Sequence, residues 1–183
     1  MKVEIRALGP DDRPWVRALL TQRWHSPRIV TRGRVHQTDD LTGFVAEVGG
    51  ERAGLVTHRI DAGECEIVSL DSLAEGQGVG SALVAAVRQT ARDAGCARLW
   101  LITTNDNLRA LRFYQKRGFV LVAVHANALD ISRRLKPEIP LTMSPCRSQI
   151  VSTWVNTLPT ASPRLLTNFA SQRVFAPRGD LRP

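Results

Sequence analysis

Apolar residues recur with two different spacings along the first 140 residues, and each spacing predicts one kind of element. Alternating or continuous apolar runs, bounded by glycine or polar turns, are typical of strands. Turns at Gly49 and Gly63 join three such runs, which predicts three consecutive antiparallel strands. The run 97–104 is apolar on both faces, as in a buried strand with a parallel neighbour. The predicted strands are 3–8, 43–48, 52–60, 64–70, 97–104 and 119–125.

Three segments have the helical spacing instead. The first begins after Asp11 and Asp12, either of which is expected to cap it, and has an apolar face that includes Leu19. The second runs from Val79 to Gly95, a residue type that commonly ends a helix. The third spans 107–119, whereas 25–40 is polar and irregular. This order of elements predicts an α/β (α+β) fold with a mixed, mostly antiparallel sheet flanked by helices.

The composition changes near residue 140. Sixteen of the 17 acidic residues precede this point, and the segment that follows contains only Asp180. It is rich in Ser, Thr, Pro and Arg and has no helical period, which is typical of poorly ordered chain. We therefore predict one domain at 1–140 and a poorly ordered or loosely packed tail at 141–183, in which 148–156 could form an edge strand. Deletion of 146–183 is then expected to leave stability nearly unchanged.

Charge and cysteine content narrow the picture only slightly. The net charge of +8 suits a nucleic-acid partner, but acidic residues are interspersed with the basic ones and aromatic residues are few, so we do not favour this reading. Cys65, Cys96 and Cys146 lack the spacing of a disulfide framework or a zinc site. No apolar run reaches the roughly 18 residues that cross a bilayer, and the chain start lacks the apolar core of a signal peptide. These features predict a cytoplasmic protein with no membrane contact and no metal.

The stretch 75–84, EGQGVGSALV, places three glycines directly before a predicted helix. The first N–H groups of a helix have no partner inside it, and they attract anions together with the helix dipole. Gly76, Gly78 and Gly80 would let a phosphate approach this backbone without obstruction. A phosphate-binding P-loop would need a lysine here, and a dinucleotide-binding turn would need a third glycine where Leu83 stands, so neither pattern fits.

The loop does resemble the acetyl-CoA signature of the GNAT family of N-acetyltransferases, which reads Gln or Arg, two residues, Gly, one residue, then Gly or Ala. Here that register gives Glu75, Gly78 and Gly80. Glu75 departs from the pattern, since Gln or Arg is usual at this position. Its carboxylate would repel a diphosphate. Either the backbone alone holds the diphosphate, or the affinity for CoA is reduced.

A second block, NLRALRFYQKRGF, strengthens the resemblance. It matches the later motif of the family in which Asn is followed by Ala, Tyr and Gly-Phe, and both motifs lie within roughly residues 3–125. The matching positions are Asn107, Ala110, Tyr114, Gly118 and Phe119. The resemblance implies a parallel splay between strands 64–73 and 97–104.

The resemblance further implies acetyl-CoA as cosubstrate and direct transfer of its acetyl group to a primary amine in a ternary complex. Such a reaction needs a base for the amine, a donor to the thioester oxygen and an acid for the leaving sulfur. A backbone N–H at Leu70 or Asp71 is the expected oxygen donor. The residues that we expect at acetyl-CoA are Leu70, Asp71, Glu75, Gly76, Gln77, Gly78, Val79, Gly80, Ser81, Asn107, Ala110 and Tyr114.

Glu66 is the predicted base. Strict alternation would place Glu64, Glu66, Val68 and Leu70 on one strand face that leads to the glycine loop, and a carboxylate there is costly without a partner or a task. Glu64 and a water relay are alternatives, and both glutamates could simply be solvated.

Tyr114 is the predicted acid, because its position carries that role in relatives; an aromatic packing role is the alternative. Asn107 is expected to contact the pantetheine arm, to cap the helix that begins at the next residue, or both.

The acceptor pocket is expected after the first helix, at Trp24, Arg32, Arg34 and His36. An arginine pair would suit a carboxylate or phosphate on a small-molecule or peptide amine, although polar side chains in loops are often only solvated. Two other functions remain open, namely a non-catalytic CoA-binding or regulatory module and a tRNA-directed acetyltransferase. The acceptor, the acyl length and the choice between monomer and homodimer are not determined by the sequence.

Overall fold

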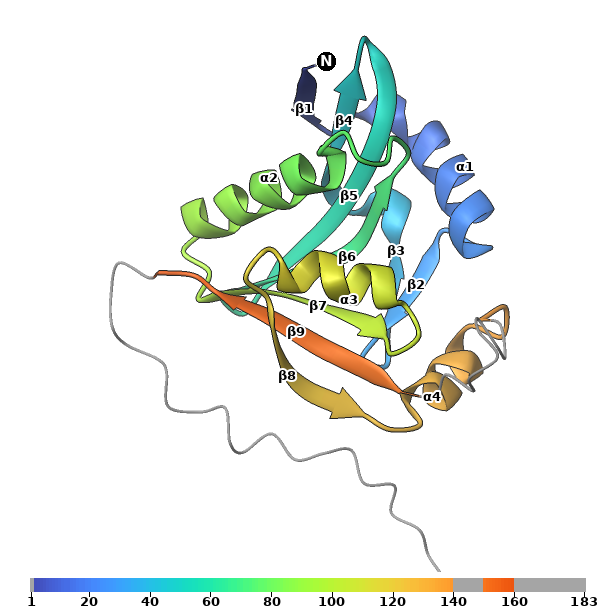
Figure 1. Cartoon of the computed structure of the whole chain (residues 1–183). Coiled ribbons are helices and arrows are strands. Elements are labelled where there is room, and N and C mark those ends of the chain that lie inside the picture. Colours follow the sequence, from blue (N-terminus) through green and yellow to red (C-terminus); the bar gives the residue numbers. More distant parts are fainter. Residues whose placement is uncertain (1, 140–149, 160–183) are drawn as a thin grey trace, which may run out of the picture.

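A twisted seven-stranded sheet forms the centre of the computed structural model, which describes residues 2–139 and 150–159 (Figure 1). The strand order is β1-β4-β5-β6-β7-β9-β8, and every neighbouring pair is antiparallel except β6 and β7, which are parallel. The predicted mixed sheet is therefore confirmed. The strands are β1 Val3–Ala7, β4 Thr42–Val48, β5 Glu51–Asp61, β6 Glu64–Ser72, β7 Arg98–Thr104, β8 Val120–His125 and β9 Val151–Thr157.

Helices cover both faces of this sheet. The apolar stripe of α2 is fully buried against the central strands, as its spacing predicts, and α2 ends in a left-handed Gly95 whose N–H bonds back to the helix. Helix α1 packs on the opposite face, where Leu19 and Leu20 meet Leu55 of β5. The helices are α1 Arg13–Trp24, α2 Val79–Asp93, α3 Leu108–Gln115 and α4 Ala128–Leu135, with short 3-10 helices at Pro10–Asp12 and Thr38–Asp40.

The two parallel strands separate after three residue pairs. Glu64, Cys65 and Glu66 pair with Arg98, Leu99 and Trp100, and no pairing continues beyond them. The strands splay apart toward their carboxyl ends, and α3 lies beside this opening (Figure 1). The splay implied by the resemblance is thus present.

A β-bulge at Val68 corrects the predicted faces of β6. The pairing with β5 steps from Ile67 to Ser69, so Val68 has no partner and the alternation reverses there. Leu70 consequently packs with the core beneath α2, whereas Asp71 pairs with Leu55 on the α1 face. The expectation that Leu70 shares the face of Glu66 was wrong, because strict alternation cannot anticipate an extra residue.

Strand β9 differs from the expectation of a loosely packed tail. It lies between β7 and β8, not at a sheet edge, and pairs with both along its length. Trp154 is 5% exposed and belongs to the main core, and its indole N–H donates to Ser152 Oγ at 2.9 Å. The sheet therefore uses residues beyond the proposed boundary at 140. The rest of the predicted tail, 141–149 and 160–183, lies outside the described residues.

The segment read as irregular, 25–40, contains a hairpin of β2 (Arg28–Thr31) and β3 (Arg34–Gln37). Helix α4, which the sequence did not indicate, fixes the hairpin next to α1. The buried Lys136 donates from Nζ to the carbonyl of Trp24 at 2.9 Å and to that of Arg28 at 2.7 Å. A cation is favourable at these carbonyls because they include the end of α1.

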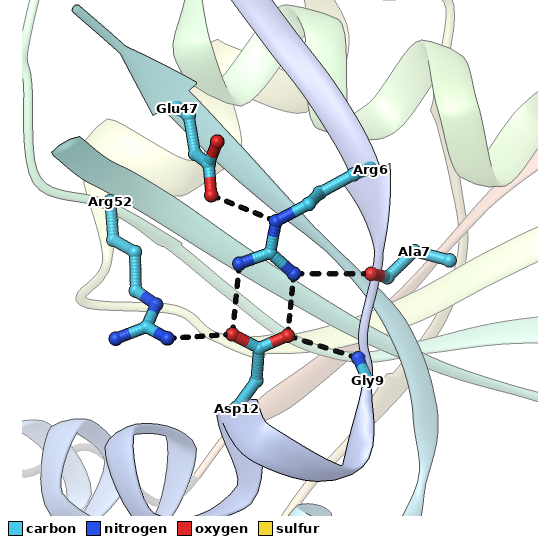
Figure 2. A network of polar contacts seen from close by, with 6 residues as sticks. All are labelled: Arg6, Ala7, Gly9, Asp12, Glu47 and Arg52. Carbon is cyan, nitrogen blue, oxygen red and sulfur yellow. Dashed lines mark hydrogen bonds and ion pairs between the residues drawn. The ribbon is translucent and has the colours of Figure 1, made fainter. Parts of the chain in front are cut away.

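A buried carboxylate ties the start of α1 to the sheet (Figure 2). Asp12 accepts two hydrogen bonds from Arg6, at 2.5 and 2.9 Å, and others from Arg52 and the Gly9 N–H, both at 2.9 Å. The pKa of Asp12 is lowered well below its usual range, chiefly by the bonds from Arg6. Neither Asp11 nor Asp12 caps α1 through its side chain; Asp12 instead faces β1 and β5.

Candidate functional site

The turn between β6 and α2 presents free backbone donors at the helix start. Gly76 and Gly78 have φ angles of +75° and +80°, which other residues rarely adopt, and Gly78 is the last residue before α2. Among the described residues, none accepts a hydrogen bond from the N–H groups of 74–81; Ala82 is the first to donate, to the Gly78 carbonyl at 3.0 Å. This donor set fits a diphosphate, as the glycine spacing predicts.

Gly80 has a different task from the other two glycines. A Cβ on Gly80 would lie 3.1 Å from the ring of Phe113, so this glycine allows α3 to pack closely against the first turn of α2. Arg117 lies over the same ring and donates to Ser81 Oγ. The close packing places a half-buried cation next to the row of free N–H groups. The sequence did not reveal this positive charge, because Arg117 lies 36 residues beyond Ser81.

Glu75, the departure from the family signature, has a cationic partner. Arg109 of α3 forms an ion pair with it at 2.7 Å, and this contact lowers the pKa of Glu75. Both side chains are largely exposed. The repulsion expected between Glu75 and a diphosphate is therefore offset by a guanidinium at the same edge of the turn.

We expect the variants Arg109→Ala and Glu75→Gln to change CoA affinity in opposite directions. Removing the arginine leaves the carboxylate uncompensated and should weaken binding about two- to fivefold, the small effect of an exposed ion pair. Glu75→Gln should bind CoA equally well or more tightly. Calorimetric titration with CoA measures both. Weaker binding by Glu75→Gln would show that the carboxylate itself contacts the ligand.

Helix α3 brings Tyr114 toward the splay. Asn107 caps this helix, since its Oδ1 accepts from the Ala110 N–H at 3.2 Å, which confirms one of its two expected roles. Tyr114 is buried and makes edge-on contacts with Phe113 and Phe119 at 5.2 and 5.4 Å between ring centroids. Burial, and then the charge of Asp71, raise the pKa of Tyr114 above its usual range. The phenol stays protonated and can donate.

The register of β6 decides which backbone N–H faces the splay. Leu73 donates to Ala53 on the β5 side, and N–H directions alternate along a strand, so Asp71 donates toward β5 and Leu70 toward the gap beside β7. Of the two expected oxygen donors, Leu70 has the suitable direction.

The carboxylate of Asp71, in contrast to its backbone, was not considered from the sequence. The bulge turns it toward the α1 face, where Oδ2 accepts from the Trp24 indole N–H at 3.0 Å. Burial raises the pKa of Asp71. Trp24, expected in the acceptor pocket, instead holds this carboxylate. Strict alternation would place Asp71 on the face opposite to Glu66. The sequence carries no signal of the bulge that brings the two to the same face, so only the structure could find the Asp71 carboxylate here.

Glu66 lies at the point where β6 and β7 part, and it is 5% exposed. Burial raises its pKa, and a hydrogen bond from Thr31 counteracts this. The Thr31 hydroxyl is also 2.6 Å from His36 Nε2, which lies 3.9 Å from Glu66 Oε2. Burial lowers the pKa of His36, which keeps the ring neutral. Glu64, the alternative base, is occupied by an ion pair with Arg98 at 2.5 Å.

A cavity of about 420 Å³ opens on this carboxylate. Glu66, Trp100 and the two predicted arginines, Arg32 and Arg34, line it, whereas His36 and Trp24 do not. His36 contacts the site through Thr31, which also lines the cavity, and through Glu66. A larger hollow of about 690 Å³ lies over β4 and β5 around Phe44, but Glu66 does not line it, so the smaller cavity is the candidate acceptor site.

Comparison with known proteins agrees with this geometry. Residues 10–119 match the model of the acetyltransferase (GNAT) family. The chain belongs to the GNAT acetyltransferase family. The Bacillus subtilis protein YdhI is 47% identical over 120 residues, which cover 65% of this chain and 75% of YdhI.

Two solved structures show the same fold as this acetyltransferase. The ribosomal-protein-S18-alanine N-acetyltransferase from Escherichia coli has a TM-score of 0.64 at 16% identity, over 90% of this chain and 99% of that enzyme. A Bacillus subtilis acetyltransferase in complex with CoA has a TM-score of 0.64 at 17% identity, over 86% and 100%.

Family membership makes the chain an acetyl-CoA-dependent acetyltransferase. No helix in the described ranges has both the length and the apolar character of a membrane span.

Proposed function

We propose that this acetyltransferase transfers the acetyl group of acetyl-CoA to a primary amine while both substrates are bound. One observation carries the proposal: the row of free N–H groups at 74–81, the N–H of Leu70 and the buried carboxylate of Glu66 all lie along the β6 edge of one splay. When bound, acetyl-CoA supplies the acetyl group already activated as a thioester.

The chain's own groups would divide the work. The N–H groups of the turn hold the diphosphate, and the Leu70 N–H donates to the thioester oxygen. Glu66 accepts the proton of the acceptor ammonium, and Tyr114 protonates the leaving sulfur. The amine that forms the new N–C bond would enter through the cavity beside Glu66, because this cavity is lined by both strands of the splay, at Glu66 of β6 and Trp100 of β7.

Glu66 and Leu70 are four residues apart, about 13 Å along an extended strand. A proton therefore has to travel between the amine and the carboxylate through water. Two buried hydroxyl groups, those of Ser69 and its cross-strand partner Thr57, lie on the Glu66 face of the sheet between Glu66 and Leu70. The two oxygens are 2.7 Å apart. We propose that these hydroxyls order the water in the relay.

An assay of thiol release from acetyl-CoA with a panel of primary amines tests the proposed reaction, and mass spectrometry identifies the amide. Amine-dependent thiol release with matching amide is expected. CoA binding without thiol release for any amine would indicate a non-catalytic CoA-binding module. An amide found only on aminoacyl-tRNA, with affinity that falls steeply with salt, would indicate a tRNA-directed enzyme.

The variant Tyr114→Phe is expected to lose about a hundredfold in kcat, a typical contribution of a general acid. The ring contacts with Phe113 and Phe119 need no hydroxyl, so the thermal unfolding midpoint and CoA affinity should stay close to wild type. An unchanged kcat would assign Tyr114 to packing alone.

A further inference from the structure

The cavity beside Glu66 contains an unusual concentration of charge. Four arginines line it, Arg32, Arg34, Arg59 and Arg98. Three carboxylates share the same walls, those of Asp61, Glu64 and Glu66. A pocket for a plain amine would need negative charge but no such surplus of guanidinium groups.

Most of these charges are already used within the protein. Asp61 pairs with Arg34 at 3.3 Å and also with Arg59, and Glu64 pairs with Arg98 at 2.5 Å. Within the described part of the chain, neither Arg32 nor Glu66 has a fully charged partner of opposite sign within 4 Å. Arg32 and Glu66 are therefore the charged groups of this cavity that form no ion pair with a permanently charged partner among the described residues.

Arg32 occupies a costly backbone position at the mouth of the cavity. With Gly33 it forms the two-residue turn of the β2–β3 hairpin, and its φ of +48° is one that Asn or Gly adopts far more easily. Its guanidinium lies 5.4 Å from the centre of the Trp100 ring, which holds it over the cavity. The arrangement leaves the donors at the guanidinium edge available to a planar anion.

Glu66 offers the opposite charge inside the same cavity. Its Oε1 atom is buried and accepts no hydrogen bond within the described residues, an expensive state for a carboxylate oxygen. The charges of Arg59, its cross-strand partner, and of Arg32 both act on Glu66, and Arg59 also forms an ion pair with Asp61. A water molecule hydrogen bonded to the ammonium group of a ligand would supply the missing donor.

We propose that the acceptor is an amino acid or a similar small molecule with a carboxylate beside its amine, whose carboxylate binds Arg32 and whose ammonium is linked to Glu66 through the relay water. This inference rests on the acetyl transfer proposed above. A carboxylate fits better than a bulkier dianion, because one guanidinium can pair with it in a bidentate way and each of the other arginines already contacts a carboxylate of the protein.

Matched acceptor pairs test the inference. Each L-amino acid is compared with its own amide, for example phenylalanine with phenylalaninamide, because the two share the side chain and differ in the charge at the carboxyl end, and the comparison is made at equal concentrations of free amine. An aminophosphonate serves as the alternative anion. The wild-type kcat/KM is expected to be about tenfold or more higher for acids than for amides, as for one lost hydrogen bond to a charged group.

The variant Arg32→Gln should abolish this preference. We expect it to lower kcat/KM for acids by about ten- to a hundredfold, the range of a lost charged hydrogen bond, and to lower kcat/KM for amides far less. Arg92→Gln, an equal loss of charge at an exposed site at the end of α2, is the control and should change neither. Calorimetry with CoA-saturated protein should show the same order of binding, acids before amides, without catalysis.

The outcomes separate this inference from the proposed function. Amides acetylated as well as acids, a phosphonate preferred over carboxylates, or an equal loss with both acceptor types in Arg32→Gln would overturn the inference and leave acetyl transfer intact. Failure to release thiol with any amine would instead overturn the proposed function.

Discussion

Replacing Trp154 by alanine is expected to destabilise the protein by about 3–5 kcal/mol, the usual cost of removing a large aromatic side chain from a core. Trp154 is nearly fully buried in the main core, and its strand is the only described partner of β8. Equilibrium unfolding in urea, followed by circular dichroism, measures the loss. A chain that ends at residue 148 lacks β9 altogether and should not reach the native sheet.

The control for this prediction is Ile150→Ala, next to the same strand. Ile150 is 36% exposed and should cost about 0.5 kcal/mol or less, as most surface changes do. A Trp154→Ala variant within 1 kcal/mol of wild type would contradict the central place of β9. It would restore the sequence-based expectation that the region beyond 140 can be deleted without consequence.

Replacing Glu66 by glutamine is expected to lower kcat/KM about a hundredfold or more, a typical contribution of a general base. The wild-type profile should rise with pH as Glu66 ionises, at a pH above the ordinary value of 4.5 because burial raises its pKa. The variant should lack this rise. A variant that keeps both the rate and the rise would assign the base to another group, such as Asp71.

Stability should respond to this substitution in the opposite sense. A carboxyl group whose folded pKa is raised stabilises the fold fully below its unfolded pKa, and this contribution is lost as the pH rises through the folded value. Glu66→Gln should therefore unfold at a higher temperature than wild type at pH 8, with the difference shrinking toward pH 4. A variant that is both inactive and less stable at pH 8 would point to a structural role. The matched control is Glu51→Gln, which removes an exposed carboxylate at the start of β5 that does not line the cavity, and it should change neither the rate nor its pH dependence.

Short sequence patterns predicted the features that depend only on residues close together in the chain. The glycines of the turn at 75–81, the capping Asn107 and the buried stripe of α2 all follow from backbone geometry and helical spacing within a few residues. Glu66 could be singled out because a carboxylate stood in an otherwise apolar strand. Its partners could not, since Thr31 and His36 reach it through a hairpin that bears no common turn dipeptide.

The features that the sequence did not reveal depend on contacts between residues far apart in the chain. β9 is short and rich in Ser and Thr, and only its neighbours on both sides make it a central strand. Arg109, the charge partner of Glu75, lies in α3, and both α2 and β7 separate the two residues along the chain. Lys136 likewise stabilises the end of a helix 112 residues away.

The unpaired Val68 makes the length of β6 as important as its composition. Removing Val68 would join Ile67 directly to Ser69, and these two already pair with adjacent residues of β5, so every later side chain would keep its present face. An added residue has no such outlet, because Leu70 and Asp71 would exchange faces unless a second bulge formed. One-residue deletions at the bulge should therefore be tolerated better than one-residue insertions, although the strand looks ordinary in one-letter code.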